Sequence, residues 1–327
     1  MANLNTTYMG LELKNPLVVS SSGLTNTIQG IERSFHAGAG AVVLKSLFEE
    51  QIDYELQDQK ESDDLSIHPE AGDYLERMGK ELGPSDYLSL IKAAKKQFGE
   101  PLIASVNCVS SKWWADWARQ IEDAGADALE LNIAIMPRGS AQVASEIEDL
   151  FLAIVDRVKR GVSIPIAVKL GPYFTALPQL IERLRRSGVK GLVLFNRFYQ
   201  LDIDVKAMRL VPAYQFSSAG EIYPTIRWTS ILSGQCGCDI AASTGVGSGE
   251  DVVKLLLAGA QAVQLCSTLY RNGYEHLTTL LSELESWMRG AGFGSVEEFR
   301  GKLSQEASSR PEGYERLQYI KALTGIA

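Results

Sequence analysis

The chain has 327 residues, of which 45% are apolar and 22% are charged, and 40 acidic against 32 basic residues give a net charge of −8. This composition is typical of a soluble globular protein with a large core. The acidic balance argues against a broad nucleic-acid-binding surface, which would need an excess of basic residues. The four Cys are too few for a disulfide scaffold and the three His are scattered, so no structural metal is expected.

The sequence shows no pattern typical of a membrane-spanning segment or of a secretion signal. No window reaches about 18 consecutive apolar residues, and the N-terminus has no basic stretch followed by an apolar one. We therefore expect a cytoplasmic protein without a membrane contact.

One phrase recurs four times along the chain. In each copy a small residue and a glycine close a helical run, and an apolar strand that ends in a polar residue follows; the copies are 37–46, 124–133, 187–196 and 258–267. Glycine suits the left-handed position after a helix. A strand that is almost entirely apolar is typical of a parallel sheet covered on both faces.

Four further strands are expected between the copies, at 16–21, 101–107, 165–170 and 238–243. Helical patterns follow all eight strands, around 27–37, 83–97, 112–123, 144–160, 175–187, 224–234, 248–258 and 274–289. Eight strand–helix units in about 250 residues predict an α/β fold, the TIM (β/α)8 barrel. A doubly wound open sheet is the alternative, which eight regular units disfavour.

The chain is expected to form a single domain over 1–327. A short N-terminal hairpin precedes the first strand, and the tail 290–327 is expected to form extra helices outside the barrel. Two insertions, 47–82 and 197–223, follow strand carboxyl ends, where they are placed to form a lid or a dimer contact. In the first insertion, Glu49, Glu50, Asp53 and Glu55 are expected to form a solvated face.

Polar residues gather at the carboxyl ends of the predicted strands, which meet at one mouth of a barrel. They are Ser20, Ser21, Lys45, Ser46, Asn107, Asn132, Lys169, Asn196, Ser243, Thr244, Gly245, Cys266 and Ser267. Two Lys and three Asn are costly to bury without a ligand, so this mouth is the predicted site. The glycine-rich turn 243–249 and Cys266-Ser267 follow strands 7 and 8, where barrels commonly bind phosphate. No GxGxxG follows the first strand, so a Rossmann-type site is not supported.

Five phrases in order, at 15–21, 41–46, 124–132, 165–170 and 258–267, resemble the dihydroorotate dehydrogenase family. They resemble still more closely the pyrimidine-reducing FMN barrel of dihydropyrimidine dehydrogenase. The similarity covers roughly residues 5–290. It implies bound FMN, with the flavin ring contacted by Ser20 and Ser21, Lys169 beside N1/O2, and the phosphate held by Thr244, Gly245, Cys266 and Ser267.

The resemblance also implies the residues that act on substrate. Lys45 would lie near the flavin and the substrate, and Asn132 would hydrogen-bond either of them. Amide side chains such as Asn132 and Asn196 both donate and accept, which suits a ring imide. We count Lys45, Asn132, Asn196 and Ser140 as catalytic candidates, and add Ser46, Asn107 and Ser218 to the cofactor-binding ones.

The chain departs from the family at its catalytic loop. After the Glu-Leu-Asn phrase the family has a Ser-Cys-Pro type loop whose Cys removes a substrate proton, whereas Ile135 stands there and cannot take a proton. Arg197 replaces a small hydroxyl residue, and the substrate-binding Asn after strand 2 is not recognisable around 66–70.

Several interpretations stay open. Ser140, Cys108 or His68 supplies the base for dihydroorotate oxidation, or the protein is an FMN-dependent oxidoreductase of another substrate. It is otherwise a flavin-binding relative with little catalysis, or a non-redox barrel that binds a phosphorylated ligand. The resemblance implies a pyrimidine-like carboxylate or imide as substrate, a soluble electron acceptor and a homodimer, and it leaves an iron–sulfur partner subunit open.

Overall fold

The computed structural model describes residues 2–52, 83–110, 114–137, 139–197, 200–213, 215–314, 320–321 and 324–325. The side chains of Cys108 and Pro212 are outside this description. His68, most of the first insertion and part of the second also lie outside the described residues.

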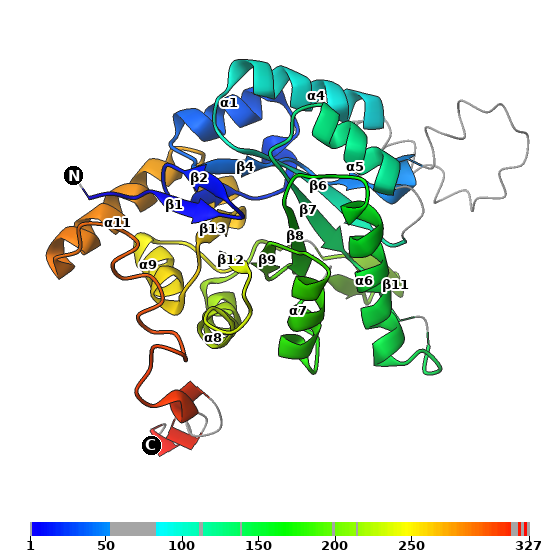
Figure 1. Ribbon diagram of the computed structural model, residues 1–327. Helices are drawn as coiled ribbons and strands as arrows, with labels where there is room; N and C mark the ends of the chain where they lie inside the picture. The colour runs from blue at the N-terminus through cyan, green and yellow to red at the C-terminus, as the bar shows by residue number, and fades with distance from the viewer. Residues whose placement is uncertain are drawn as a thin grey trace, which may run out of the picture.

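Eight parallel strands close into a barrel, as predicted (Figure 1). In chain order they are β3 Leu17–Val19, β4 Ala41–Val43, β6 Leu102–Cys108, β7 Ala128–Ile133, β8 Ile166–Leu170, β9 Gly191–Leu194, β12 Asp239–Ser243 and β13 Ala262–Leu265. Each pairs with its neighbour in this order, and β13 pairs with β3 to close the ring. A short strand, β5 Leu47–Phe48, continues beside the upper end of β6. The closed ring rules out the open doubly wound sheet.

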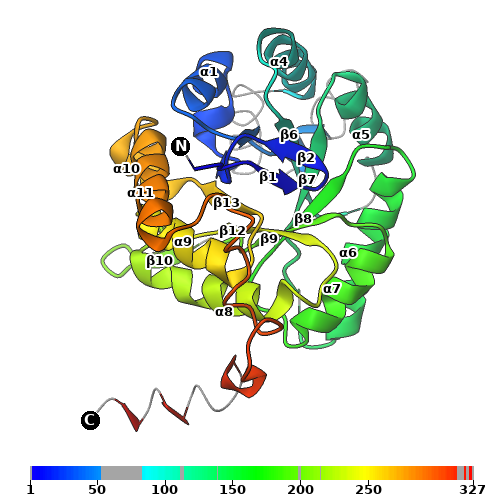
Figure 2. The ribbon, with the colours of Figure 1, turned by 60° about the vertical axis from the view of Figure 1, so that its left-hand side comes forward.

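Helices surround the strands on the outside (Figure 2). They are α1 Ile28–His36, α4 Pro84–Gln97, α5 Trp114–Asp123, α6 Ala144–Lys159, α7 Leu177–Arg186, α8 Ile222–Leu232, α9 Gly249–Ala258, the short α10 Ser267–Asn272 and α11 His276–Ala291. The recurring glycines Gly38, Gly125, Gly188 and Gly259 all have φ between +93° and +112°. They therefore end α1, α5, α7 and α9 in the left-handed conformation that the repeated phrase predicted.

The strands divide the apolar side chains into two cores with a period of two residues. Outward residues such as Leu129, Val168 and Leu192 pack against the helices. Inward residues such as Ala128, Ala167 and Ala241 fill the lower part of the barrel, toward the amino ends of the strands. Successive residues of a strand point to opposite faces, so a residue two positions after an inward alanine also faces the barrel interior.

The N-terminal hairpin, β1 Thr6–Tyr8 and β2 Leu11–Leu13, lies across the lower end of the barrel (Figure 2). Tyr8 and Met9 are buried in the inner core and approach Gly191 at the start of β9. The backbone amide of Met9 donates to the carboxylate of Asp239 at 2.6 Å. The hairpin is therefore a plug for the end of the barrel opposite the predicted site.

The second insertion forms a separate antiparallel hairpin, β10 Leu201–Asp204 and β11 Arg209–Pro212.

In the first insertion, Glu50 is exposed but Glu49 is only 4% exposed, so the prediction of a solvated face is wrong for Glu49. Its carboxylate accepts hydrogen bonds from Ser110 and from the indole of Trp114. A buried carboxylate that directly follows β5 therefore anchors the loop after β6.

The C-terminal tail is less helical than expected up to residue 314, where the continuous described stretch ends. After α11 the chain makes turns over residues 292–310, and the short 3-10 helix η3 spans Pro311–Tyr314. Phe293 and Phe299 pack against Trp287 of α11, and Asn3 pairs with Ser295.

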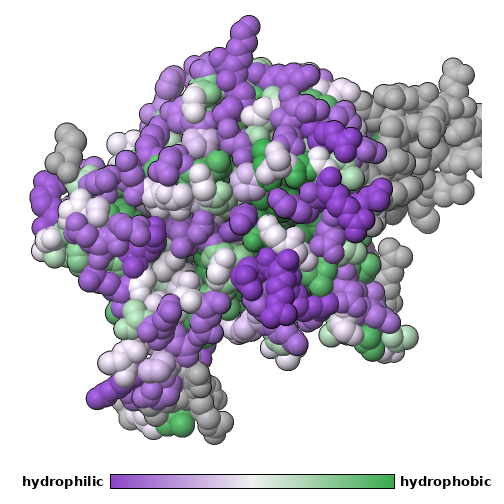
Figure 3. Space-filling view, in the orientation of Figure 1, coloured by the Kyte–Doolittle hydropathy of each residue, from purple (hydrophilic) through white to green (hydrophobic). Residues whose placement is uncertain are grey.

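Hydrophilic residues cover much of the face shown in Figure 3. No helix in the described part of the chain is long and apolar enough to cross a membrane.

Candidate active site

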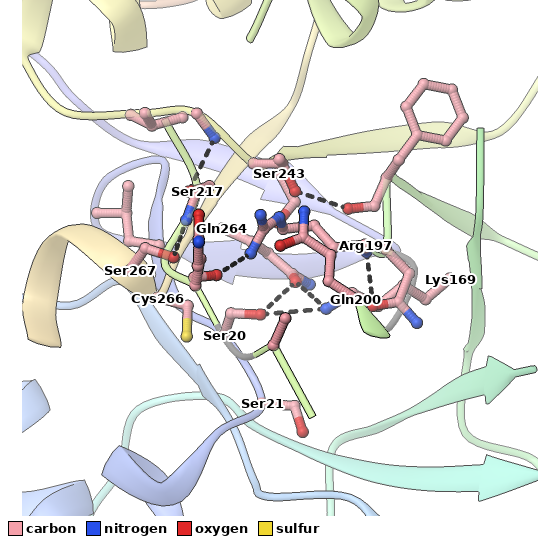
Figure 4. A pocket seen from close by; sticks show the side chains of 18 residues that line it. Ser20, Ser21, Lys169, Arg197, Gln200, Ser217, Ser243, Gln264, Cys266 and Ser267 are labelled. Atoms are coloured by element: carbon pink, nitrogen blue, oxygen red, sulfur yellow. Dashed lines mark hydrogen bonds between the residues drawn. The ribbon is translucent and has the colours of Figure 1, made fainter. Parts of the chain in front are cut away.

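A cavity of about 210 Å³ opens at the carboxyl ends of β3, β8, β9, β12 and β13 (Figure 4). Its walls come mainly from strand ends and from the residues that follow them. The lining residues are Ser20, Ser21, Lys169, Phe195, Asn196, Arg197, Gln200, Ala213, Gln215, Ser217, Ser243, Thr244, Gly245, Val246, Gln264, Leu265, Cys266 and Ser267. The cavity therefore lies where barrel enzymes place their chemistry.

The floor of the cavity is a buried polar cluster around Lys169. The ammonium of Lys169 is 3.1 Å from the Ser20 hydroxyl, 3.2 Å from Oε1 of Gln264 and 3.5 Å from Oε1 of Glu130. Gln264 in turn donates to Oε2 of Glu130 at 2.6 Å. The ammonium of Lys169 has three N–H donors and faces three acceptor atoms, so its charge is held in one position.

The opposite end of the cavity is built from backbone and hydroxyl groups. Thr244 and Gly245 are consecutive residues with φ of +83° and +81°. A Cβ on Gly245 would lie 2.3 Å from the backbone nitrogen of Ile222, so only glycine fits there. The hydroxyl of Ser217 accepts from the Gly245 amide at 3.4 Å, and the hydroxyl of Ser267 accepts from the Ser217 amide at 3.1 Å. A non-glycine residue held at positive φ is costly and is found preferentially at functional sites.

The second insertion closes one side of the cavity. The guanidinium of Arg197 donates to Glu221 at 2.8 Å and to the backbone carbonyl of Gln215. Next to it, the amide of Asn196 donates to Oδ1 of Asn132 at 2.8 Å. Arg197, at the start of the second insertion, therefore holds the later part of the same insertion, around Gln215 and Glu221, above the barrel mouth.

The structure brings most of the predicted site residues together. Those that line the cavity are Ser20, Ser21, Lys169, Asn196, Ser243, Thr244, Gly245, Cys266 and Ser267. Asn132 reaches it through Asn196, and Ser46 lies behind Ser21, 3.0 Å away through their hydroxyls. Lys45, on the stretch after β4, is half-buried and does not line the cavity, and the same holds for Asn107 on β6.

Two predicted residues lie elsewhere. Ser218 is exposed and precedes the 3-10 helix η2 Ala219–Glu221, where its hydroxyl donates to Glu221; its neighbour Ser217 lines the cavity instead. Ser140 is exposed on a turn before α6 and is not a lining residue.

Sequence reasoning missed Glu130 and Gln264, although a signal for both was present. Asn132 and Lys169 were placed at the barrel mouth, and Glu130 precedes Asn132 by two residues on the same strand. Gln264 likewise precedes Cys266 by two residues. Since side chains two residues apart on a strand share a face, both had to point inward. They are 1% and 2% exposed, respectively.

A replacement for the missing base is not evident among the lining residues. Ile135 is half-buried and packs against the core. Cys266 is the thiol that lines the cavity, and burial raises its pKa despite the nearby Lys169, so the thiol is protonated at neutral pH. Cys108 and His68, the other candidates, have side chains outside the described residues.

The residues present fit a flavin mononucleotide. A flavin reduced by hydride carries negative charge at N1/O2, which a fixed cation such as Lys169 can stabilise. The hydroxyls of Ser217 and Ser267 and the tight Thr244-Gly245 turn form a cradle suited to a phosphate. The charged end and the cradle belong to one cavity, as a ligand with both a ring and a phosphate requires.

Comparison with known proteins gives the same family as the phrases. The family model for dihydroorotate dehydrogenase matches residues 3–288. Similar chains include a "dihydroorotate dehydrogenase B (NAD(+)), catalytic subunit" of Thermoplasma acidophilum, 28% identical over 92% of this chain and 99% of that protein. The protein of the same name from Methanocaldococcus jannaschii is 28% identical over 88% of this chain and 94% of its own length.

A plant protein with a different name is similar as well. The "dihydropyrimidine dehydrogenase (NADP(+)), chloroplastic" of Arabidopsis thaliana is 26% identical over 93% of this chain and 77% of that protein. Both resemblances expected from the sequence are thus confirmed, but the expectation that the second is the closer of the two is not, since its identity is 26% against 28%. The chain belongs to the dihydroorotate dehydrogenase family and is an oxidoreductase that acts on CH–CH groups.

Proposed function

We propose that this protein binds FMN in the cavity above Lys169 and transfers a hydride between a pyrimidine-like substrate and flavin N5. The observation that carries the proposal is a buried ammonium fixed in a cavity that is also lined by the Thr244-Gly245 turn and the hydroxyls of Ser217 and Ser267. A non-redox barrel for a phosphorylated ligand would use the cradle but would leave the buried Lys169 without a purpose.

The residues of the chain would divide the work between them. Lys169 would offset the charge that develops on the flavin, and the cradle would hold the phosphate. The Asn132–Asn196 pair would orient a ring amide or imide, because each side chain keeps further donors and acceptors. Bound FMN would accept the hydride, and the barrel floor would exclude water from that step.

The space available implies a movement on binding. The cavity measures about 210 Å³, whereas ligand sites commonly measure roughly 300–1,000 Å³. Arg197, Gln200 and Gln215 occupy its side from the second insertion. We expect this side to move outward when FMN enters, which makes Arg197 the residue most directly affected by the ligand.

Dihydroorotate is the first substrate to test, and a different CH–CH substrate is the second candidate. One residue favours the second: Ile135 stands where the family has its base, and it cannot take a proton. Loss of a general base typically costs about 10²–10⁴-fold in rate without removing cofactor affinity.

Absorbance spectroscopy tests the proposal in two steps. The purified protein, reconstituted with FMN, is expected to show the oxidised flavin band and to retain it through gel filtration. Anaerobic stopped-flow mixing with dihydroorotate then separates the candidates. Bleaching would support dihydroorotate oxidation, whereas a flavin bleached only by dithionite would point to another substrate. A protein that retains no FMN would refute the proposed function.

A homodimer is part of the same proposal. Ile203 and Leu210 are cross-strand partners in the β10–β11 hairpin, so they share one face, and they are 60% and 65% exposed. Exposed apolar faces of this kind commonly mark protein–protein contacts. Light scattering should give twice the chain mass for the wild type and the single mass for Ile203→Glu. A monomeric wild type would end this part of the proposal.

A further inference from the structure

The floor of the cavity contains a second charged residue, Glu130. This side chain is 1% exposed, lies on β7 and faces the barrel interior beneath Lys169. Its Oε1 is 3.5 Å from the Lys169 ammonium, and its Oε2 accepts a 2.6 Å hydrogen bond from Gln264. Gln264 uses its other side-chain atom, Oε1, to accept from Lys169 and from Ser20. The amide of Gln264 thus bridges the two charged groups.

This arrangement fixes both the position and the net charge of the floor. A buried carboxylate without a counter-ion is very costly, and so is a buried ammonium. Glu130 and Lys169 offset each other, while Ser20 and Gln264 contribute no charge. On the far side of the cavity, Arg197 has its own carboxylate partner, Glu221. The described part of the floor is therefore close to neutral, although its outermost charged group is a cation.

We propose that Glu130 is a positioning residue that sets the electron affinity of the bound flavin, with Gln264 as the amide that holds its carboxylate beside Lys169. The inference rests on the proposed FMN site. Lys169 alone would strongly favour a flavin that has gained negative charge. Glu130 reduces that preference, because its negative charge lies just behind the ammonium and acts on the same ligand through a medium of low polarity.

Glu130 and Gln264 have side chains of the same length that end in a carboxylate and a carboxamide, respectively. Exchanging these two groups makes a symmetric test possible. Glu130→Gln removes one negative charge from the floor and leaves it positive. Gln264→Glu adds one negative charge and leaves the floor negative. The double variant Glu130→Gln/Gln264→Glu exchanges the two groups and restores the original net charge with nearly the same shapes.

Sulfite is the probe, because it adds to oxidised flavin and leaves a negatively charged adduct whose formation is followed by loss of the flavin band. For one unit charge at this range we expect the sulfite dissociation constant of Glu130→Gln to fall about tenfold, and that of Gln264→Glu to rise by a similar factor. The exchanged variant should return to within about threefold of the wild type. Tenfold corresponds to about 30 mV for a two-electron couple, so the midpoint potential of Glu130→Gln should rise by that amount.

A purely structural role for Glu130 would give a different pattern. Loss of packing weakens FMN binding and shifts the sulfite constant in the same direction for both single variants, and the exchanged variant would be the worst. Asp239→Asn is the control, since it removes a carboxylate from the lower end of the same barrel, where it holds Met9. It should change the sulfite constant by less than about twofold.

Three outcomes are informative. Opposite shifts in the two single variants support the proposal, and shifts of the same sign, or none, overturn it. Wild-type protein that binds no FMN would contradict the proposed function before the variants are made. Where Glu130→Gln does not fold, Gln264→Glu alone decides, since an unchanged or tighter sulfite affinity in that variant also overturns the proposal.

Discussion

The two halves of the barrel interior are built from the same strands but by opposite rules. In the lower half the inward residues are small and apolar, among them Ala41, Ala128, Ala167, Ala241 and Ala262, and the N-terminal hairpin inserts Tyr8 and Met9 between them. In the upper half, two residues further along, the same strands place Glu130, Lys169, Ser243 and Gln264. The lower half is closed mainly by packing, with the Met9 amide hydrogen-bonded to Asp239, whereas the upper half is held by hydrogen bonds and charge.

This difference shows how a barrel separates stability from function along one strand. Ala128, Glu130 and Asn132 follow one another at a spacing of two residues and pass from the plug to the floor and then to the cavity mouth. A change in the lower layer should act on packing only. A change in the upper layer should disturb partners from three strands at once, because Lys169 contacts residues of β7, β13 and the end of β3.

Removing the cation of the upper layer should have the largest effect. Lys169→Met leaves the carboxylate of Glu130 buried without a counter-charge, which should lower the free energy of unfolding by about 3–5 kcal/mol. Urea unfolding measures this loss. Lys169→Met/Glu130→Met removes both charges and should recover much of the stability.

Lys95→Met is the control for this prediction. Lys95 pairs with Asp127 at 2.8 Å, but both side chains are partly exposed, so about 1 kcal/mol or less is expected. Equal losses for Lys95→Met and Lys169→Met would contradict the view that the upper layer depends on its buried charge pair.

A second buried carboxylate, Glu49, sharpens the comparison because its partners in the described part of the chain are uncharged hydrogen-bond donors. It accepts from the amides of Val109 and Ser110 and from the side chains of Ser110 and Trp114. Burial acts to raise its pKa, but these hydrogen bonds outweigh burial and lower the pKa. Glu49→Gln should cost about 1.5–3 kcal/mol at pH 7, the usual worth of hydrogen bonds to a charged group.

The cost of Glu49→Gln should depend on pH in a defined direction. A carboxyl group with a lowered pKa in the folded state stabilises the protein fully above its unfolded pKa of about 4.3. That stabilisation is lost as the pH falls through the lower folded value. Unfolding in urea should therefore give a constant difference between variant and wild type from pH 7 to about 5 and a shrinking one below about 4. Glu50→Gln, at the exposed neighbouring position, should show no such dependence.

Two buried tyrosines provide the smallest and most closely matched test. The hydroxyl of Tyr8 in the plug is buried and has no hydrogen-bond partner among the residues that the structure describes. The hydroxyl of Tyr87 on α4 donates to the carbonyl of Ser105 and accepts from its amide. Tyr8→Phe should be neutral or stabilising by about 1 kcal/mol, whereas Tyr87→Phe should destabilise by about 1 kcal/mol. Thermal unfolding of the two variants gives the signs, and a clear loss in Tyr8→Phe would mean that the plug has a polar contact.

Most of the fold was predictable because it is local. The repeated small-Gly phrase, the apolar strands and the helical patterns depend on neighbours in the chain, and the observed helices begin and end within a few residues of the expected ranges. The described tail beyond residue 292 was not, because its apolar residues Phe293 and Phe299 pack against Trp287 of α11 from turns. Helical spacing of apolar residues alone does not distinguish these cases.

The candidate site, like the fold, was predictable only where it depends on local sequence patterns. Residues at strand ends were identified because closure of the barrel brings those ends together. Ser217 and Arg197 depend on the return of the second insertion over the mouth, which no local pattern specifies. Glu49 looked like a member of an acidic surface run, and only its contacts with Ser110 and Trp114 distinguish it from the exposed Glu50.

The amino-acid sequence by itself determined the barrel, the end of it that carries the site and the family, because these follow from periodicity and from residues close together in the chain. The tertiary structure decided which of the polar residues meet. Lys169, Glu130 and Gln264 lie on different strands, up to 134 positions apart, and their hydrogen bonds arise only when the ring closes. Buried charge is tolerable only with such partners, so the chemistry of the floor is a property of the closed barrel.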